Sequence, residues 1–127
     1  MCCLHKTTLE SVKKTQDFKR VYSQGKYAAD ALFVVYALAN NLPHNRLGVT
    51  VSKKVGNAVA RNRIKRWVKE CYRQKTAEPF SGGQAYDIIF VARTPVGQLD
   101  GKSAYSNVNE SVKNLLIRVG RKLGVAT

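Results

Sequence analysis

The side chains that usually perform catalysis are few in this chain and lie far apart. The eight acidic residues are Glu10, Asp17, Asp30, Glu70, Glu78, Asp87, Asp100 and Glu110. They form no DxD or ExxH pattern, and the two histidines, His5 and His44, stand apart from one another. A protein nuclease needs paired acids, a histidine with an acid, or clustered metal ligands. We therefore predict no catalytic residue, no metal site made by protein side chains and no organic cofactor.

Positive charge, in contrast, is concentrated in one stretch. Nine of the 22 lysine and arginine residues lie in Lys53–Lys75, KKVGNAVARNRIKRWVKECYRQK, against a single acid, Glu70. Apolar residues recur there at helical spacing: Ala60, Ile64, Trp67, Val68, Cys71 and Tyr72. The opposite face of such a helix carries Asn62, Arg66, Lys69 and Arg73, with Arg63 and Lys65 at its rims and Arg61 near the apolar edge. Because neighbouring like charges repel, this density is typical of a helix that meets a polyanion.

The predicted start of this helix is a candidate anion site. Gly56-Asn57 is a turn signal, and asparagine is a favourable N-cap. The unpaired N–H groups and the positive end of the helix dipole then lie beside Lys53, Lys54 and Arg61. Such a site suits a phosphate, or an oxygen that also holds a metal ion. The sequence does not separate these two readings, and Asn57 can serve as a plain cap in both.

Composition favours one nucleic-acid-binding domain. The chain has 127 residues, of which 44% are hydrophobic, as in a globular domain with a single modest core. Its net charge of +14 is typical of a nucleic-acid binder, with an anionic membrane surface as the competing partner. The longest apolar run, Ala31–Ala39, is far shorter than the roughly 20 residues of a membrane span. We predict a single domain over residues 1–127 that binds RNA or DNA, with no membrane partner.

The cysteines and the N-terminal sequence indicate a reducing compartment. Cys2, Cys3 and Cys71 are odd in number and lack the spacing of a disulfide framework. The start of the chain also lacks a charged region followed by an apolar signal segment. We expect free thiols, a core position for Cys71 and a cytoplasmic protein.

Periodicity divides the chain into six elements after an irregular basic arm, Met1–Lys14. A short helix over Gln16–Gln24 is predicted to be capped by Thr15 and to end at a left-handed Gly25. The later elements are strands Ala31–Ala39 and Arg46–Ser52, the basic helix, strand Ala85–Ala92 and helix Ser103–Leu123, with loops over Thr76–Gly83 and Pro95–Lys102. This order predicts an α+β two-layer sandwich, with helices packed on one mostly antiparallel sheet.

Three details of this topology can be predicted. Strand Ala31–Ala39 is apolar on both faces and is expected to be central, whether both faces are covered or one is covered and the other concave. The short connection after it predicts that Arg46–Ser52 runs antiparallel to it. If the second and third strands are parallel, the basic helix closes a βαβ unit, for which the default hand is right.

The stretch Ser52–Arg66, SKKVGNAVARNRIKR, closely resembles the signature of the protein subunit of bacterial ribonuclease P, centred on Arg61-Asn62-Arg63. The resemblance extends to DFKRVYSQGK, LFVVYAL, RLGVTVS and DIIFVART, and covers roughly Thr15 to Leu123. It implies an endoribonuclease in which the protein binds ribonuclease P RNA and precursor tRNA and helps remove the 5′ leader. It also implies that the RNA subunit binds most of the Mg²⁺ and that catalysis resides in that RNA. The implied fold is that of the second domain of small-subunit ribosomal protein five, with a left-handed βαβ crossover.

The resemblance assigns residues to both RNA partners. The residues that match the helix facing the catalytic RNA are Arg61, Asn62, Arg63, Lys65, Arg66 and Lys69. The residues that match the leader cleft are Phe18, Tyr22, Tyr36, Lys53, Lys54 and Arg93. Asn57 and Arg61 match positions next to phosphate or metal. Aromatic side chains beside cations also suit stacking of unpaired bases on physical grounds, although core packing is the alternative for Phe18 and Tyr22.

Two other functions stay open from sequence. A structural RNA-binding protein of the ribosomal type, with no role in processing, would need the same charge and the same fold. An autonomous metal nuclease would have to cleave without any RNA subunit. No obligate protein partner is evident from the sequence.

Overall fold

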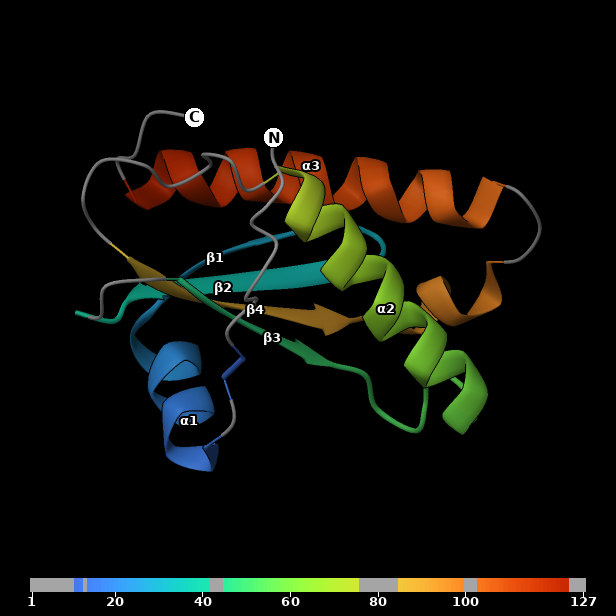
Figure 1. The fold of residues 1–127 in the computed structure, drawn as a ribbon, viewed down its shortest axis with the longest axis horizontal. Coiled ribbons are helices and arrows are strands. Elements are labelled where there is room, and N and C mark those ends of the chain that lie inside the picture. Colours follow the sequence, from blue (N-terminus) through green and yellow to red (C-terminus); the bar gives the residue numbers. More distant parts are fainter. Residues whose placement is uncertain (1–10, 13, 42–44, 76–84, 100–102, 124–127) are drawn as a thin grey trace.

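The structure is a computed structural model that describes residues 11–12, 14–41, 45–75, 85–99 and 103–123. Its elements, in chain order, are α1 (Thr15–Gln24), β1 (Lys26–Ala29), β2 (Phe33–Ala39), β3 (Arg46–Thr50), α2 (Ala58–Lys75), β4 (Tyr86–Ala92), the 3-10 helix η2 (Thr94–Gln98) and α3 (Ser103–Leu123). One sheet carries helices on its faces, so the predicted α+β class is confirmed (Figure 1). No helix among these residues is both long enough and apolar enough to cross a membrane.

The four strands lie in the order β1-β2-β4-β3. The β1–β2 and β2–β4 pairs are antiparallel, and the β3–β4 pair is parallel. β3 therefore runs antiparallel to β2, as predicted, but the two strands are not neighbours. Every residue of β4 except Val91 is buried, which explains why this late strand occupies an interior position between them.

Helix α2 connects the parallel strands β3 and β4. In Figure 1 the chain runs to the right along β3, returns through α2 in front of the sheet and runs to the right again along β4, above β3. This path is left-handed, so the default hand is wrong here and the hand implied by the family resemblance is found. A right-handed path between the same strands would place α2 on the face of the sheet that α1 occupies.

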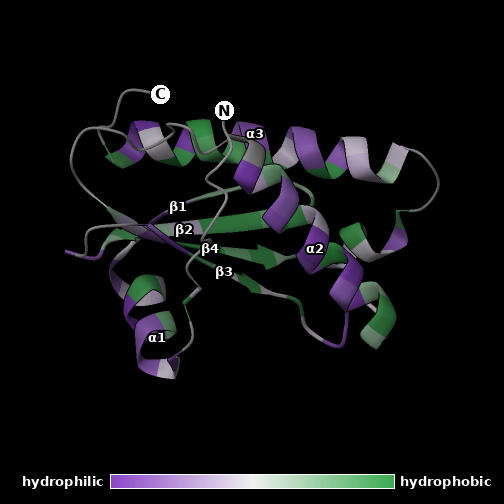
Figure 2. Ribbon diagram, in the orientation of Figure 1, coloured by the Kyte–Doolittle hydropathy of each residue, from purple (hydrophilic) through white to green (hydrophobic). Residues whose placement is uncertain are grey.

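The core lies mainly between the sheet and the helices α2 and α3. Phe33 and Phe90 from the two central strands are fully buried there, with their rings edge to face and their centroids 6.0 Å apart. A smaller cluster on the other face joins Val21 of α1 to Val12 and Ile89. The central strands are strongly apolar, whereas α1 and α2 carry mixed faces (Figure 2). The side chains of β2 that face α1 are only half-buried, so this face of the sheet is partly open.

Two short elements were not predicted. β1 has only four residues, two of them alanine, and shows no alternation of apolar and polar side chains. η2 lies where the loop Pro95–Lys102 was expected to begin, with proline in its first turn. Helix α1 also starts one residue early: Thr15 is its first residue, and Lys14 occupies the cap position without a side-chain hydrogen bond.

Two further predictions need correction. Gly25 is extended, with φ −78°, and is not left-handed. A Cβ atom there would lie 2.6 Å from Val21 O and 2.7 Å from Ala37 O, so close packing is what favours glycine. The arm is not wholly irregular either, because Ser11 bridges to Leu47 of β3 and Val12 N donates to Leu47 O (3.0 Å). The remainder of the arm, apart from Lys14, and the loop Thr76–Gly83 lie outside the described residues.

Candidate nucleic-acid interface

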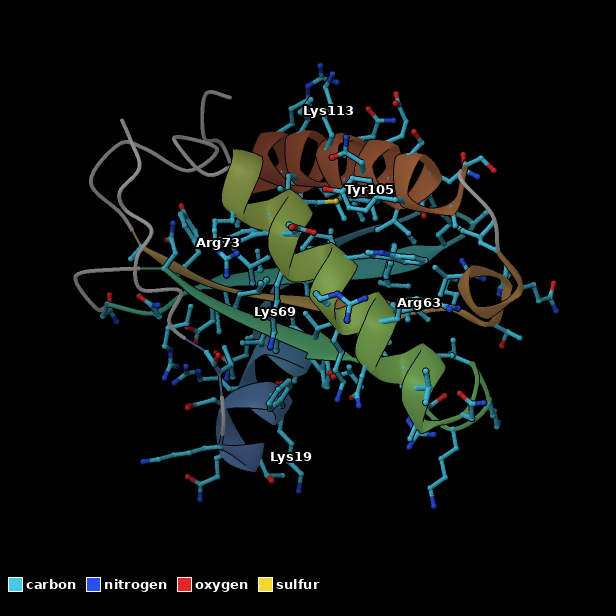
Figure 3. All side chains as sticks on the ribbon, turned by 45° about the vertical axis from the view of Figure 1, so that its right-hand side comes forward. Lys19, Arg63, Lys69, Arg73, Tyr105 and Lys113 are labelled. Carbon is cyan, nitrogen blue, oxygen red and sulfur yellow. The ribbon has the colours of Figure 1, made fainter. Side chains whose placement is uncertain are left out.

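Helix α2 presents one buried and one exposed face, as its sequence predicts. Ile64, Val68 and Cys71 are almost fully buried, and Tyr72 is 2% exposed. Asn62, Arg66, Lys69 and Arg73, which were expected on the outer face, are all exposed, and so are Ala58, Val59 and Glu70. The four outer-face residues, together with Lys65 and Glu70, line a depression of about 430 Å³. Figure 3 shows Lys69 and Arg73 on this helix, well separated from Lys113 on α3.

The two rim residues have different surroundings. Lys65 is half-buried beside the depression. The guanidinium carbon of Arg63 lies 5.2 Å from the centroid of the Trp67 ring, and Trp67 in turn meets Tyr105 of α3 edge to face at 6.5 Å. Arg63 is thus half-buried on the flank that leads to α3 (Figure 3). Its side chain contributes to packing as well as to charge.

The start of α2 is capped as predicted. Asn57 Oδ1 accepts a hydrogen bond from Ala60 N (2.9 Å), and Asn57 O accepts one from Arg61 N (2.9 Å). The Arg61 side chain folds back, and its Nη1 donates to Gly56 O (3.0 Å). Lys53 and Lys54 are exposed in the turn before the cap. Three cations therefore lie in the turn before the helix and in its first turn, near the positive end of the helix dipole, which favours an anion.

The oxygen donors at this helix start suit phosphate recognition better than direct coordination of Mg²⁺. Residues 51–61 include no carboxylate, and Asn57 Oδ1 and Gly56 O already accept hydrogen bonds within the chain. Mg²⁺ in proteins is usually held by one or two carboxylates together with water and phosphate oxygens. Elsewhere in the described part of the chain, no three His, Cys, Asp or Glu side chains gather in a way that could hold a metal ion.

Four aromatic rings form a continuous line on the open face of the sheet. We call Phe18, Tyr22, Tyr36 and Tyr27 the aromatic row. The distances between successive ring centroids are 6.2 Å for Phe18–Tyr22, 5.0 Å for Tyr22–Tyr36 and 5.8 Å for Tyr36–Tyr27. Tyr22 is 38% exposed and Tyr27 55% exposed, while the other two rings are half-buried. The structure thus brings the three predicted aromatics together and adds Tyr27.

Sequence reasoning missed Tyr27 because β1 itself was missed. Tyr27 pairs with Tyr36 across the β1–β2 ladder, and Tyr36 pairs with Ile89 of β4, which pairs with Gly48 of β3. These four residues form one line across the whole sheet. Only the register of the β1–β2 hairpin reveals that Tyr27 lies beside Tyr36.

Small residues of β3 allow α1 to pack closely against the sheet. A Cβ atom on Gly48 would lie 3.1 Å from Cε1 and 3.2 Å from Cζ of Phe18, so the glycine lets this ring approach the sheet. The Tyr22 hydroxyl lies 3.4 Å from Thr50 Oγ1 and forms a hydrogen bond with it. The Tyr22 hydroxyl therefore helps to hold this ring against β3.

A buried carboxylate of β4 holds α1 against the sheet through a hydrogen-bonded ion pair. Asp87 of β4 is fully buried and accepts two hydrogen bonds from Arg46, at 2.7 Å from Nε and 2.6 Å from Nη2. It accepts two more, from Arg20 Nη2 of α1 (3.1 Å) and Asn40 Nδ2 (2.9 Å). Asp17 of α1 lies 3.4 Å from Arg46 and 3.5 Å from Arg20. We call these five residues the Asp87 hub, although in the sequence Asp87 stands out only as one of the scattered acidic residues.

Neighbouring charges and hydrogen bonds keep the Asp87 carboxylate ionised. Burial on its own raises the pKa of Asp87, but the hydrogen bonds from Arg46 and Asn40 and the charges of Arg46 and Arg20 outweigh burial, so the pKa is lowered. The hydrogen bond to Asp87 raises the pKa of Arg46. Arg20 stands between Phe18 and Tyr22 in α1, so this ion pair fixes the helix that carries half of the aromatic row.

The remaining predicted cations lie at one end of the sheet. β3 and β4 are parallel, so Lys53, Lys54 and Arg93 all follow strand ends at the same edge of the sheet. Arg93 is exposed, and its Nη1 donates to Asp30 O (2.9 Å). It stands four residues along the chain from Ile89, the β4 residue that pairs with Tyr36, so it lies beyond the aromatic row towards the strand ends.

Comparison with known proteins finds relatives that match most of this chain. A model of the Ribonuclease P family matches residues 7–119. The chain is 41% identical over 109 residues to the ribonuclease P protein component of Clostridioides difficile, covering 86% of this chain and 90% of that protein. It is 43% identical over 108 residues to the one from Caldanaerobacter subterraneus subsp. tengcongensis, covering 85% and 87%.

Solved structures with the same fold are similar over most of their length. The RNase P protein of Staphylococcus aureus superposes with a TM-score of 0.73 at 36% identity, covering 86% of this chain and 94% of that one. The RNase P protein from Thermotoga maritima superposes with a TM-score of 0.72 at 31% identity, covering 86% and 96%. Sequence and structure together show that this chain belongs to the ribonuclease P protein family.

Proposed function

We propose that this chain is the protein subunit of a bacterial ribonuclease P that acts in the cytoplasm. It binds ribonuclease P RNA and the 5′ leader of precursor tRNA, and it assists the Mg²⁺-dependent endonucleolytic removal of that leader. The observation that carries the proposal is the presence of two surfaces with different chemistry on one small fold. The outer face of α2 is cationic, and the aromatic row crosses the open face of the sheet.

The aromatic row suits a single strand whose sequence varies. Leaders differ between precursors, so a protein that binds them must tolerate any base. An aromatic ring stacks on the face of every base, at about 1–3 kcal/mol per base, and nearby lysines and arginines hold the phosphates. We assign Phe18, Tyr22 and Tyr36 to the bases, and Lys53, Lys54 and Arg93 to the backbone at the edge of the same face.

The α2 surface suits a folded RNA. A rigid helix presents guanidinium and ammonium groups at fixed spacing, and guanidinium groups match phosphate oxygens in pairs. We assign Arg61, Asn62, Arg63, Lys65, Arg66 and Lys69 to the catalytic RNA. Asn57 and Arg61 at the start of the helix face phosphates close to where the two RNAs meet. The two surfaces lie on opposite sides of the sheet, and α2 begins at the end of the sheet where β3 ends, directly after Lys53 and Lys54.

Catalysis is assigned to the RNA subunit. Bound Mg²⁺ supplies an activated water and stabilises charge on the phosphate in such reactions. The helix start of this chain lacks the carboxylates that would hold such an ion directly, so we assign Mg²⁺ binding mainly to the RNA. The protein contributes affinity for the leader, orientation of the two RNAs and positive charge.

Reconstitution tests this function. A bacterial ribonuclease P RNA is assayed for cleavage of a leader-bearing precursor tRNA at low Mg²⁺, with and without the protein. We expect the protein to restore cleavage that the RNA alone performs poorly, and to cleave nothing without RNA. Binding to RNA with no gain in cleavage would favour the structural ribosomal-type alternative. Cleavage by the protein alone would favour an autonomous nuclease.

A further inference from the structure

The β1 edge of the sheet carries an exposed aromatic ring with a fixed cation. Tyr27 is 55% exposed. The Nζ atom of Lys122, in the last turn of α3, lies 5.0 Å from the centroid of the Tyr27 ring and donates a hydrogen bond to Tyr27 O (2.6 Å). The ring and the ammonium group are therefore held together at the surface, in a geometry typical of a cation–π contact.

A second cation lies along the same edge. β1 pairs only with β2 in the described sheet, so its other side offers carbonyl groups without a strand partner. Arg118 Nη1 of α3 donates to Ala29 O (2.9 Å), two residues along from the carbonyl that Lys122 contacts. An ammonium group has three N–H donors and a guanidinium five, so each keeps donors for another acceptor after this bond. Two cations are thus held in place beside Tyr27.

Tyr27 also continues the aromatic row. Its ring lies 5.8 Å from that of Tyr36, with 33° between the ring planes, which is closer to stacking than to an edge-to-face contact. A single-stranded RNA that lies on Phe18, Tyr22 and Tyr36 reaches Tyr27 if it continues in the same direction. The edge therefore offers a further ring for a base and two cations for a phosphate.

We propose that Tyr27, Lys122 and Arg118 form an additional nucleotide subsite, in which a base of the single-stranded leader stacks on Tyr27 and a phosphate contacts the two cations. The subsite rests on the proposed function and deepens it, because it determines how many leader nucleotides the protein contacts. A leader long enough to pass Tyr36 gains affinity from the β1 edge, and a shorter one does not.

The test is a series of precursor tRNAs whose leaders grow by one nucleotide at a time, bound to the holoenzyme reconstituted with ribonuclease P RNA. For the unchanged protein, affinity is expected to rise with leader length and then reach a plateau. Tyr27→Ala should remove the last part of this rise, about fivefold or more in affinity, and leave short leaders unaffected. Tyr27→Phe should keep the full rise.

Lys122→Met gives an independent readout, with Lys113→Met as the matched control, since Lys113 is an exposed lysine on the same helix. Lys122→Met should lower the salt dependence of binding by about one unit for long leaders only, and Lys113→Met should not. An equal effect of Tyr27→Ala at every leader length, or none at all, overturns the subsite. Phe18→Ala separates the two proposals: a leader-dependent loss with this variant preserves the proposed function even if the subsite fails.

Discussion

Among individual residues, Asp87 has the largest influence on the site without lying in it. Its carboxylate is fully buried and joins β4 to Arg46 of β3 and Arg20 of α1. Burying a charge is favourable only when its partners are well placed, and here four hydrogen bonds compensate the carboxylate. The position of α1, and with it that of Phe18 and Tyr22, depends on this compensation.

Asp87→Asn should therefore destabilise the fold. The change leaves Arg46 and Arg20 facing a neutral amide, and removing one partner of a buried ion pair typically costs about 3–5 kcal/mol. The lower end is expected here, because the Arg20 side chain is 40% exposed and is screened by water. Denaturant unfolding measures the loss. An unchanged free energy of unfolding would show that the hub does not hold the fold together.

The same variant predicts a pH dependence. The pKa of Asp87 is lowered below its ordinary 3.8 in the folded state, so its stabilising effect is complete above that value and is lost as pH falls towards the folded pKa. The difference in free energy of unfolding between the unchanged protein and Asp87→Asn should be constant near neutral pH and shrink in acid below about pH 4. Glu110→Gln, which replaces an exposed carboxylate outside the hub, is the control variant.

At the scale of elements, the contribution of charge to RNA binding can be tested most directly on the exposed face of α2. Arg66→Ala and Lys69→Ala should each weaken assembly with ribonuclease P RNA and lower the salt dependence of binding by about one unit, because each residue is proposed to contact one phosphate. These residues are exposed, so their loss does not disturb the core. Arg63 is less suitable, since its side chain also packs on Trp67.

Lys113→Ala on α3 is the matched control for this measurement. Lys113 is as exposed as Lys69 but projects from α3, away from the sheet (Figure 3). It should leave the salt dependence of RNA binding unchanged. A slope that stays the same when Arg66 and Lys69 are both replaced would contradict the assignment of α2 to the catalytic RNA.

Elements with a strong period were predictable from sequence, and the others were not. α3 has the predicted bounds, and the cap at Asn57 and the exposed face of α2 follow directly from residue spacing. β1 was not predicted because its four residues are too few to show a period. η2 was not predicted because a single helical turn beside Pro95 resembles a loop in sequence. The placement of β4 between β2 and β3 depends on how much apolar surface each strand buries, which local spacing does not record.

At the scale of the whole molecule, the two RNA surfaces lie on different sides of one sheet. α2 and α3 cover one side, whereas the aromatic row occupies the other with α1. Under the proposed function, their separation predicts that binding to the catalytic RNA and binding to the leader can be changed independently. Of the residues for these surfaces, those in α2 followed from helical spacing, while the gathering of Phe18, Tyr22 and Tyr36 needed the tertiary fold or the family resemblance.

Phe18→Ala tests this separation. It should weaken holoenzyme binding to a leader-bearing precursor by about fivefold or more, because one stacking ring is lost, and change binding to mature tRNA much less. Arg66→Ala should instead weaken assembly of the holoenzyme itself. Paired affinity measurements on the two ligands check this. Equal losses for precursor and mature tRNA would assign Phe18 to packing alone.

Both borders of the sheet are partly closed to other strands. Lys122 and Arg118 occupy carbonyl groups on the outer side of β1, and Ser11 and Val12 pair with Leu47 of β3. An unprotected edge strand can pair with a strand from another copy of the protein, which leads to aggregation. A newly made chain can therefore stay dispersed before it meets its RNA, and the charges that attract that RNA also help keep its copies apart.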